Sequence, residues 1–259
     1  MPPETPPDPG LLVDEHPRSI VVRIHQPERA NALTDAMLED LVRLTARPHP
    51  DVRVIVLTGS GDRHFSAGLD LGNLDGPALA ERLMRGEELL RAATAAIAAC
   101  PCPVVAVVNG AAYGGGLELA VACDWRIASG NATLGMPAAR LGVVYAPEGL
   151  ARFLAIMGPA RTRALFLTGR PVSADRARQI GLVDQVVPAD DLAAAIDETV
   201  SDVVRSAPTA VAGTRAAIGL LSAAPAPQDA ATIERIRLEA YASDQFTEGL
   251  AAFRERRAP

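Results

Sequence analysis

Short runs of β-branched residues alternate along the chain with stretches whose apolar residues recur at helical spacing. The runs Ile20–Ile24, Val52–Leu57 and Val104–Val108 have the length and composition of buried strands. Between the first two, residues Asp35–Ala46 place four apolar side chains on one face of a helix, namely Met37, Leu38, Leu41 and Leu44. This alternation of strands and amphipathic helices predicts a β/α fold.

The second half of the chain departs from simple alternation. Three further strand candidates are short, and the first two follow each other closely: Asp124–Ala128, Ala132–Leu134 and Leu182–Val187. We therefore do not expect a simple doubly wound sheet. From about residue 189 the pattern is helical. Ala-rich stretches at Asp191–Val204 and Thr209–Leu221, bounded by prolines, predict a helical C-terminal appendage.

Composition limits the chemistry that the chain can perform. A chain of 259 residues, 49% of them hydrophobic, is long enough to bury a full core. Its net charge of −6 and its lack of a long basic run argue against nucleic acid as a partner. All 25 Lys and Arg residues are arginine, so that a lysine Schiff base is excluded.

The cysteines and the N-terminal residues indicate the cellular compartment of the protein. Cys100, Cys102 and Cys123 have neither metal-site nor redox spacing and predict buried reduced thiols. Residues 1–10 are Pro-rich and acidic, unlike a signal or transit peptide, and predict a loose leader. No apolar run reaches the ~18 residues that a membrane helix requires. We therefore expect a cytoplasmic protein with no membrane partner.

Two segments rich in small residues follow predicted strands, over residues 63–71 and 109–120, and the second contains three consecutive glycines. Loops at strand ends expose backbone donors that no sheet partner has taken. Glycines at a helix N-terminus allow close approach, and the helix dipole there favours negative charge. Glu118 lies about one helical turn after Gly115, so we expect its carboxylate on the same face of that helix.

Three glycines by themselves indicate a flexible turn as readily as a site, but the two segments together resemble the crotonase (enoyl-CoA hydratase/isomerase) superfamily. The resemblance rests on Phe65–Leu71 and Asn109–Ala120, and it extends through residues 167–183 over nearly the whole chain. It implies that the backbone N–H groups of Leu69 and Gly115 form the oxyanion hole of a thioester enzyme. Each such donor contributes about 3–4 kcal/mol to stabilisation of the transition state.

The resemblance also implies a substrate carried by coenzyme A (CoA), with no other cofactor and no metal. Asp70 should in addition brace its own loop. The implied fold is an α/β, crotonase-like ββα spiral core over residues 11–200, followed by a C-terminal helical trimerisation region over residues 201–259. The implied assembly is a homotrimer or homohexamer. Residues at the family's CoA-contacting positions are Arg29, Ala30, Ala67, Asp70, Leu71, Phe253 and Arg256.

The sequence departs from the hydratase pattern at one position. A hydratase of this family uses two glutamates, one to activate water and one to move the proton at Cα. Glu118 matches one of them, whereas Ala138 stands at the position of the other. Three solutions stay open. Glu148 enters the site and restores the pair, Glu118 alone isomerises a double bond, or Tyr145 assists a decarboxylation, since its surroundings loosely resemble the methylmalonyl-CoA decarboxylase branch.

We therefore expect an enoyl-CoA hydratase or isomerase in which Glu118 is the acid/base. Glu148 is also explained as a first-turn acid that favours the dipole of a helix over Gly149–Ile156. Tyr145 is also explained as a packed aromatic residue. The alternative within the fold is an acyl-CoA decarboxylase or hydrolase, and the alternative from another class is a non-catalytic acyl-CoA-binding subunit.

Overall fold

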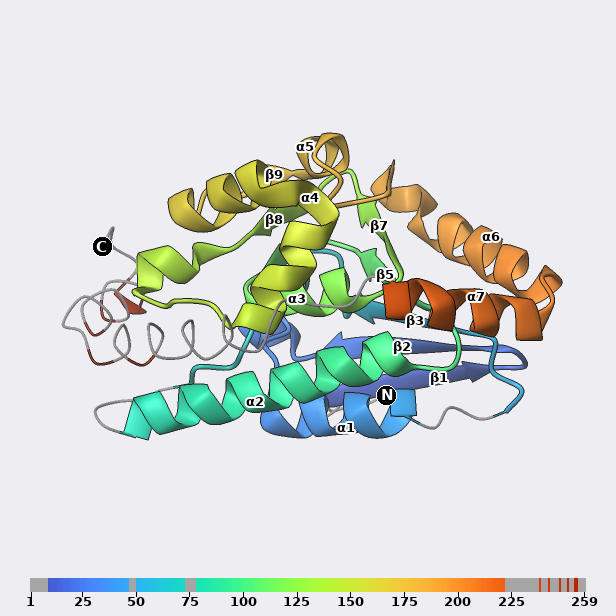
Figure 1. Cartoon of the computed structure of the whole chain (residues 1–259), viewed down its shortest axis with the longest axis horizontal. Coiled ribbons are helices and arrows are strands. Elements are labelled where there is room, and N and C mark those ends of the chain that lie inside the picture. The colour runs from blue at the N-terminus through green and yellow to red at the C-terminus, as the bar shows by residue number, and fades with distance from the viewer. Residues whose placement is uncertain are drawn as a thin grey trace, which may run out of the picture.

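The larger of the two sheets forms the centre of the protein (Figure 1). The computed structural model describes residues 9–46, 50–72 and 78–221, together with Leu238, Ala242, Thr247, Ala251, Arg254 and Glu255. The order of strands in the larger sheet is β1-β2-β3-β5-β7-β10, in which only the β1–β2 pair is antiparallel. Its strands are β1 (Gly10–His16), β2 (Ser19–His25), β3 (Val54–Gly59), β5 (Val104–Val108), β7 (Trp125–Ser129) and β10 (Gln185–Val187).

The smaller sheet is built from strands that directly follow strands of the larger one. Its order is β4-β6-β8-β9, with bounds β4 (His64–Ser66), β6 (Ala111–Tyr113), β8 (Thr133–Gly135) and β9 (Val172–Ser173). Three times, a strand of the larger sheet leads into a strand of the smaller sheet and then into a helix: β3-β4-α2, β5-β6-α3 and β7-β8-α4. This threefold repetition confirms the predicted ββα spiral.

The helices cover both faces of the larger sheet (Figure 1). Three short 3₁₀ helices connect elements, η1 (Pro27–Arg29), η2 (Pro137–Leu141) and η3 (Ala189–Asp191). The α-helices are α1 (Asp35–Ala46), α2 (Ala78–Ala99), α3 (Gly115–Ala122), α4 (Pro147–Thr168), α5 (Ala174–Gln179), α6 (Leu192–Arg205) and α7 (Pro208–Leu221).

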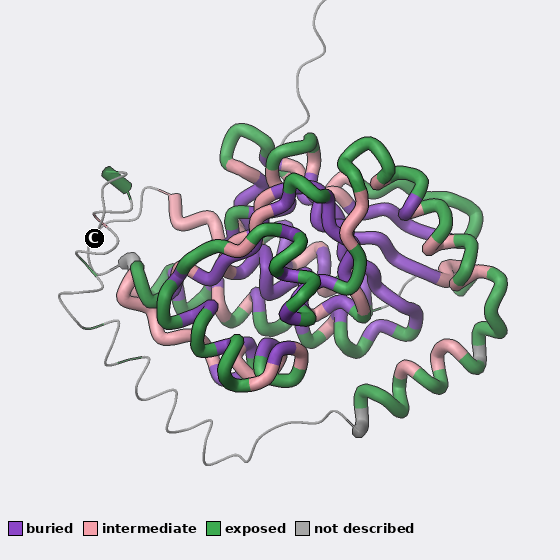
Figure 2. Tube along the Cα trace, turned by 90° about the horizontal axis from the view of Figure 1, so that it is seen from above, coloured by how far each residue is buried: buried purple, intermediate pink, exposed green. Residues whose placement is uncertain are grey.

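Alternate side chains of the central strands divide between two apolar layers. One face of β2, β3 and β5 joins the main core with α1 and α2, and the other face packs against Leu192, Ile196 and Val200 of α6. Parallel strands buried on both faces read as continuous apolar runs, which is the pattern that predicted them. In Figure 2 the buried segments, drawn in purple, gather in the middle of the molecule.

Most predicted elements occur near their expected positions. The helix Asp35–Ala46 and the strand Val104–Val108 have the predicted bounds, whereas of Leu182–Val187 only the last three residues form a strand. Helix α4 continues past the predicted segment, across a break at Gly158, where φ is 72°. Strand β1 was not predicted, because its residues are half-buried or exposed and carry no buried periodicity.

The C-terminal appendage is helical as far as the structure describes it. The proposed domain boundary at residue 200 lies inside α6, which packs on the sheet. Helix α7 is largely exposed and leads away from the buried centre in Figure 2. No helix in the described part of the chain is long and apolar enough to cross a membrane. Residues 1–8, most of the predicted leader, lie outside the described residues, and Gly10 begins β1.

Two buried asparagines fasten the turn between β3 and β4. The Asn109 side-chain amide donates to the carbonyls of Gly59 (3.0 Å) and Gly61 (2.7 Å), and its oxygen accepts from the Gly59 N–H (3.0 Å). The Asn31 amide donates to the His64 carbonyl (2.7 Å). Because β4 begins at His64, these hydrogen bonds fix the start of the loop that carries the first predicted amide.

We expect Asn109→Ala to lower the free energy of unfolding by about 2–4 kcal/mol, because it leaves several buried backbone groups without partners. Urea denaturation measures the change. The exposed Asn131→Ala is the matched control and should stay within about 0.5 kcal/mol of the parent chain. Equal stability of the two variants would contradict the role given to Asn109.

Candidate active site

The loop after β4 is held by a strand-like contact with the turn before α1. The Leu33 N–H donates to the Gly68 carbonyl (2.8 Å), and the Asp70 N–H donates to the Leu33 carbonyl (2.8 Å). These two hydrogen bonds use the carbonyl of Gly68 and the N–H of Asp70, the neighbours of Leu69. The N–H and C=O of Leu69 itself therefore point away from this turn, as those of alternate residues in an extended segment do.

The N-terminus of α3 lies in backbone contact with the same loop. A Cβ on Gly68, whose φ is +97°, would lie 3.1 Å from the Gly115 nitrogen. A Cβ on Gly116 would lie 2.6 Å from the Ser66 carbonyl oxygen, closer than real Cβ atoms approach. The two backbones pack so closely at Gly68 and Gly116 that only glycine, which has no side chain, fits at these positions.

The amide N–H groups of Leu69 and Gly115 have no hydrogen-bond acceptor in the described part of the chain. Gly115 opens α3, where the first N–H groups have no intrahelical partner. A Cβ on Gly115 would lie 3.6 Å from the Leu69 nitrogen, so the two amides are neighbours. Two unengaged donors side by side at a helix N-terminus are suited to binding a developing negative charge.

Glu118 is buried one turn further along α3, with 4% of its surface exposed. The Tyr145 hydroxyl donates to Oε2 (2.6 Å), and Nη1 of Arg152 lies 3.2 Å from Oε1. Burial raises the pKa of the Glu118 carboxyl above its ordinary value, while the hydrogen bond from Tyr145 and the charge of Arg152 oppose this rise. The carboxyl is thus a stronger base than an exposed glutamate and is fixed through both oxygens.

The start of α4 and the residue before its cap supply both partners of Glu118. Gly149 makes room for them, because a Cβ there would lie 3.0 Å from Oε1 of Glu118 and 2.7 Å from the Tyr145 ring. The ring of Tyr145 also packs edge-on against Phe166, at 5.4 Å between centroids. Sequence reasoning missed Arg152. The available signal was a single arginine inside the apolar segment Gly149–Ile156.

The sequence matches a known protein family over most of its length. Residues 16–259 match the family model described as enoyl-CoA hydratase/isomerase. The chain belongs to the enoyl-CoA hydratase/isomerase family. The crotonase resemblance is therefore confirmed, and the protein is an enzyme of this family.

Individual relatives cover almost the whole chain. The putative enoyl-CoA hydratase/isomerase YngF of Bacillus subtilis is 33% identical over 255 residues, 95% of each chain. The crystal structure of an enoyl-CoA hydratase from Bacillus anthracis aligns with a TM-score of 0.76 and 31% identity, covering 96% of this chain and 97% of the other. A methylmalonyl-CoA decarboxylase in complex with 2-nitronate-propionyl-CoA aligns with a TM-score of 0.85 and 27% identity, covering 96% of each chain. Because this fold supports more than one reaction, the choice of reaction depends on the site residues.

Among the described residues, no second carboxylate is seen to hydrogen-bond to Glu118, and the family's second glutamate position holds Ala138. Ala138 is buried in η2 and presents a methyl group. Glu148 is exposed in the first turn of α4, and no hydrogen bond among the described residues joins it to Glu118. After burial, the charges of Glu87 and Glu148 add to the raised pKa of Glu118. Of the two candidates for a partner, Tyr145 therefore contacts Glu118 and Glu148 does not.

The predicted CoA-binding residues in the first part of the chain lie together. Arg29 forms an ion pair with Asp70 (3.0 Å), and the Ala67 N–H donates to the Ala30 carbonyl (3.0 Å). Asp70 also accepts a hydrogen bond from the N–H two residues further on (2.9 Å), which is the bracing role predicted for it. Leu71 follows and is half-buried. The two remaining candidates lie outside the described residues, namely Phe253 and Arg256.

The burial of Glu118 makes stability depend on pH. Because its pKa is raised, the folded chain holds this proton more tightly than the unfolded chain does. The resulting stabilisation is complete below the unfolded-state pKa and is lost as the pH rises through the folded-state pKa. Glu118→Gln has no proton to lose. Its stability relative to the parent chain should therefore increase as the pH rises from the ordinary glutamate pKa of about 4 towards neutrality.

Thermal denaturation of both proteins across this interval measures the difference. Glu198→Gln, at an exposed position of α6 that is not among the charges shifting the pKa of Glu118, is the matched control for the removal of one negative charge. A relative stability of Glu118→Gln that stays constant or falls with rising pH contradicts the raised pKa.

Proposed function

We propose that this enzyme isomerises the double bond of an enoyl-CoA thioester. Glu118 moves a proton between two carbons while the N–H groups of Leu69 and Gly115 hold the thioester oxygen. The observation that carries the proposal is the buried Glu118 carboxylate on α3, the helix whose first N–H, that of Gly115, donates to no acceptor among the described residues. At the position of a second carboxylate the chain has Ala138. The CoA substrate class is supported by the family and by the CoA-complexed decarboxylase of the same fold.

The reaction divides into two proton transfers. The Glu118 carboxylate removes a proton from C2 of a 3-enoyl thioester, and the electron pair moves onto the thioester oxygen. The resulting dienolate is stabilised by the two amide donors, which are already in place before the reaction. Glu118 then returns the proton to C4, the carbonyl re-forms, and the product is the 2-enoyl thioester. One carboxylate suffices because no water is added.

Tyr145 and Arg152 act through Glu118. Each hydrogen-bonds one carboxylate oxygen, so the pair fixes the orientation of the base. Both also favour the ionised form, which burial alone disfavours. The carboxylate is more basic than an exposed one, and this basicity favours removal of a proton from a weak carbon acid.

Hydration is the second candidate reaction, because the Bacillus anthracis structure is named as an enoyl-CoA hydratase and the family model as enoyl-CoA hydratase/isomerase. It requires a second group to activate water. Of the two candidates, the Tyr145 hydroxyl already donates to Glu118, and Glu148 acts on Glu118 through its charge. Decarboxylation assisted by Tyr145 has weaker support, since the Tyr145 hydroxyl is engaged by Glu118. A non-catalytic acyl-CoA binder does not account for a buried carboxylate with two dedicated partners.

We expect wild-type enzyme to convert 3-enoyl-CoA to 2-enoyl-CoA, and Glu118→Gln to lower kcat by about 10²–10⁴-fold, because general acid–base catalysis contributes this much. Glu148→Gln should change kcat by less than threefold, roughly the effect of an exposed charge. Crotonyl-CoA and methylmalonyl-CoA, assayed in parallel, test the rival reactions. Faster hydration of crotonyl-CoA, decarboxylation that survives Glu118→Gln, or equal losses in both variants would each overturn the proposal.

We further propose a homotrimer or homohexamer in the cytoplasm, with no cofactor beyond the CoA of the substrate. The exposed apolar side chains of Leu167 (72%) and Ile218 (59%) support burial in an assembly, and sedimentation velocity measures its mass. Three free thiols accord with a reducing compartment. No group of three or more metal-ligating side chains that could hold an ion occurs within the described ranges.

A further inference from the structure

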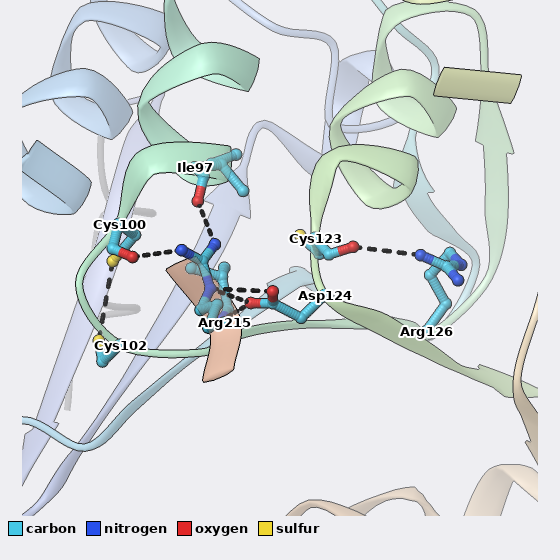
Figure 3. Close-up of polar contacts among 8 residues, drawn as sticks. Ile97, Cys100, Cys102, Cys123, Asp124, Arg126 and Arg215 are labelled. Atoms are coloured by element: carbon cyan, nitrogen blue, oxygen red, sulfur yellow. Dashed lines mark hydrogen bonds and ion pairs between the residues drawn. The ribbon is translucent and has the colours of Figure 1, made fainter. Parts of the chain in front are cut away.

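Two of the three cysteines lie next to each other at the connection between α2 and β5. Cys100 and Cys102 flank Pro101, and their Sγ atoms are 3.7 Å apart (Figure 3). Both are free thiols with at most 7% of their surface exposed. The third thiol, Cys123, donates instead to the Leu119 carbonyl at 3.3 Å. The sequence spacing gave no indication of this pairing.

An arginine from the C-terminal helix lies over the same connection. Nη1 of Arg215, on α7, donates to the Cys100 carbonyl, and Nη2 donates to the Ile97 carbonyl at 2.8 Å (Figure 3). Nε donates to Asp124 at 2.9 Å. Arg215 thus caps the last carbonyls of α2 and brings a positive charge close to the thiol pair.

The two thiols are electrostatically unequal. The hydrogen bond from the Cys102 thiol, with the Cys102 N–H and the charge of Arg215, holds the pKa of Cys100 below its ordinary value despite burial. That same hydrogen bond and burial raise the pKa of Cys102. Cys100 is therefore the more acidic of the two thiols, and the thiolate is the nucleophilic form of cysteine.

A small molecule can reach Cys102 from one side. A cavity of about 220 Å³ lies between α7 and the edge of the larger sheet. Its lining includes Cys102 and both flanking prolines, Pro101 and Pro103, together with Val211 of α7. Because a water molecule occupies about 30 Å³ in the liquid, this cavity has room for hydrogen peroxide next to Cys102, whose sulfur lies 3.7 Å from that of Cys100.

We propose that Cys100 and Cys102 are a redox-active pair that hydrogen peroxide converts into an intramolecular disulfide. The Cys100 thiolate attacks one peroxide oxygen, the O–O bond breaks, and the leaving hydroxide takes up the proton that the Cys100 thiol released, forming water. This gives a sulfenic acid at Cys100. The Cys102 sulfur then attacks the Cys100 sulfur, and the hydroxyl leaves with the Cys102 proton as a second water. Two thiols are oxidised, one peroxide is reduced, and two waters form.

The short separation favours this disulfide over further oxidation. A resolving thiol 3.7 Å from the sulfenic sulfur reacts before a second peroxide molecule arrives. A disulfide between residues two apart closes a small, strained ring, and strained disulfides are readily reduced. The modification is therefore reversible by a dithiol. It is independent of the proposed isomerase activity.

The test treats the whole chain with hydrogen peroxide and counts thiols after denaturation. We expect the three free thiols to fall to one, a mass loss of about 2 Da, and a Cys100–Cys102 cross-link in the peptide map. Dithiothreitol should restore all three thiols. Retention of three thiols, oxidation of Cys123 at the same rate, or sulfonic acids without a cross-link would overturn the proposal.

Two variants separate the roles of the thiols. Cys102→Ser should accumulate a sulfenic acid at Cys100 that dimedone labels, because the resolving thiol is gone. The control Cys123→Ser should form the same cross-link as the parent chain. Labelling of Cys123 in place of Cys100 contradicts the assignment, and the peptide map of the unmodified sequence decides the question if a variant does not fold.

Discussion

The backbone contact between the loop after β4 and the first turn of α3 determines where the amides of Leu69 and Gly115 lie. Side chains at Gly68 or Gly116 would separate the two segments, since a Cβ at either position meets backbone atoms of the other loop. The contact joins two of the three ββα units. The site is therefore a consequence of how successive units of the spiral stack, and neither unit carries it alone.

Placing Glu118 beside these amides requires burying a charge. An unpaired carboxylate in this position would be strongly disfavoured, and the third ββα unit supplies the compensation through Tyr145 and Arg152. The compensation is partial, because burial outweighs the two partners and the pKa stays raised. Partial compensation suits a base that must take up and release a proton at the same place.

Helix α2 connects this site with the cysteine pair. Its middle portion contacts the site, since a Cβ on Gly115 would meet Leu90 at 2.9 Å and one on Gly86 would meet Leu69 at 3.3 Å. Its C-terminal end leads into Cys100 and is capped by Arg215. The largely exposed α7 is thus tied to the body of the protein at the end of a helix whose other residues support the oxyanion loop.

The amino-acid sequence by itself determined the central strands, helix α1 and the glycine-rich amide loops, because these depend on local periodicity and on backbone geometry that only glycine permits. It also placed Glu118 one turn after Gly115, since helix geometry is regular. It did not reveal strand β1, whose half-exposed residues carry no period. A strand at the edge of a sheet forms because it pairs with the neighbouring strand, and the pattern of apolar residues along the chain does not show this pairing.

Only the tertiary structure decided which side chains meet Glu118 and which sulfurs meet each other. Tyr145 and Glu148 were both candidates in the sequence, yet Tyr145, just before α4, contacts the carboxylate and Glu148, in the first turn of α4, is exposed. Arg152 and Arg215 act on groups 34 and 115 residues away in the chain. Such contacts depend on how whole helices pack against one another. A local sequence pattern predicts each helix separately and does not contain their relative placement.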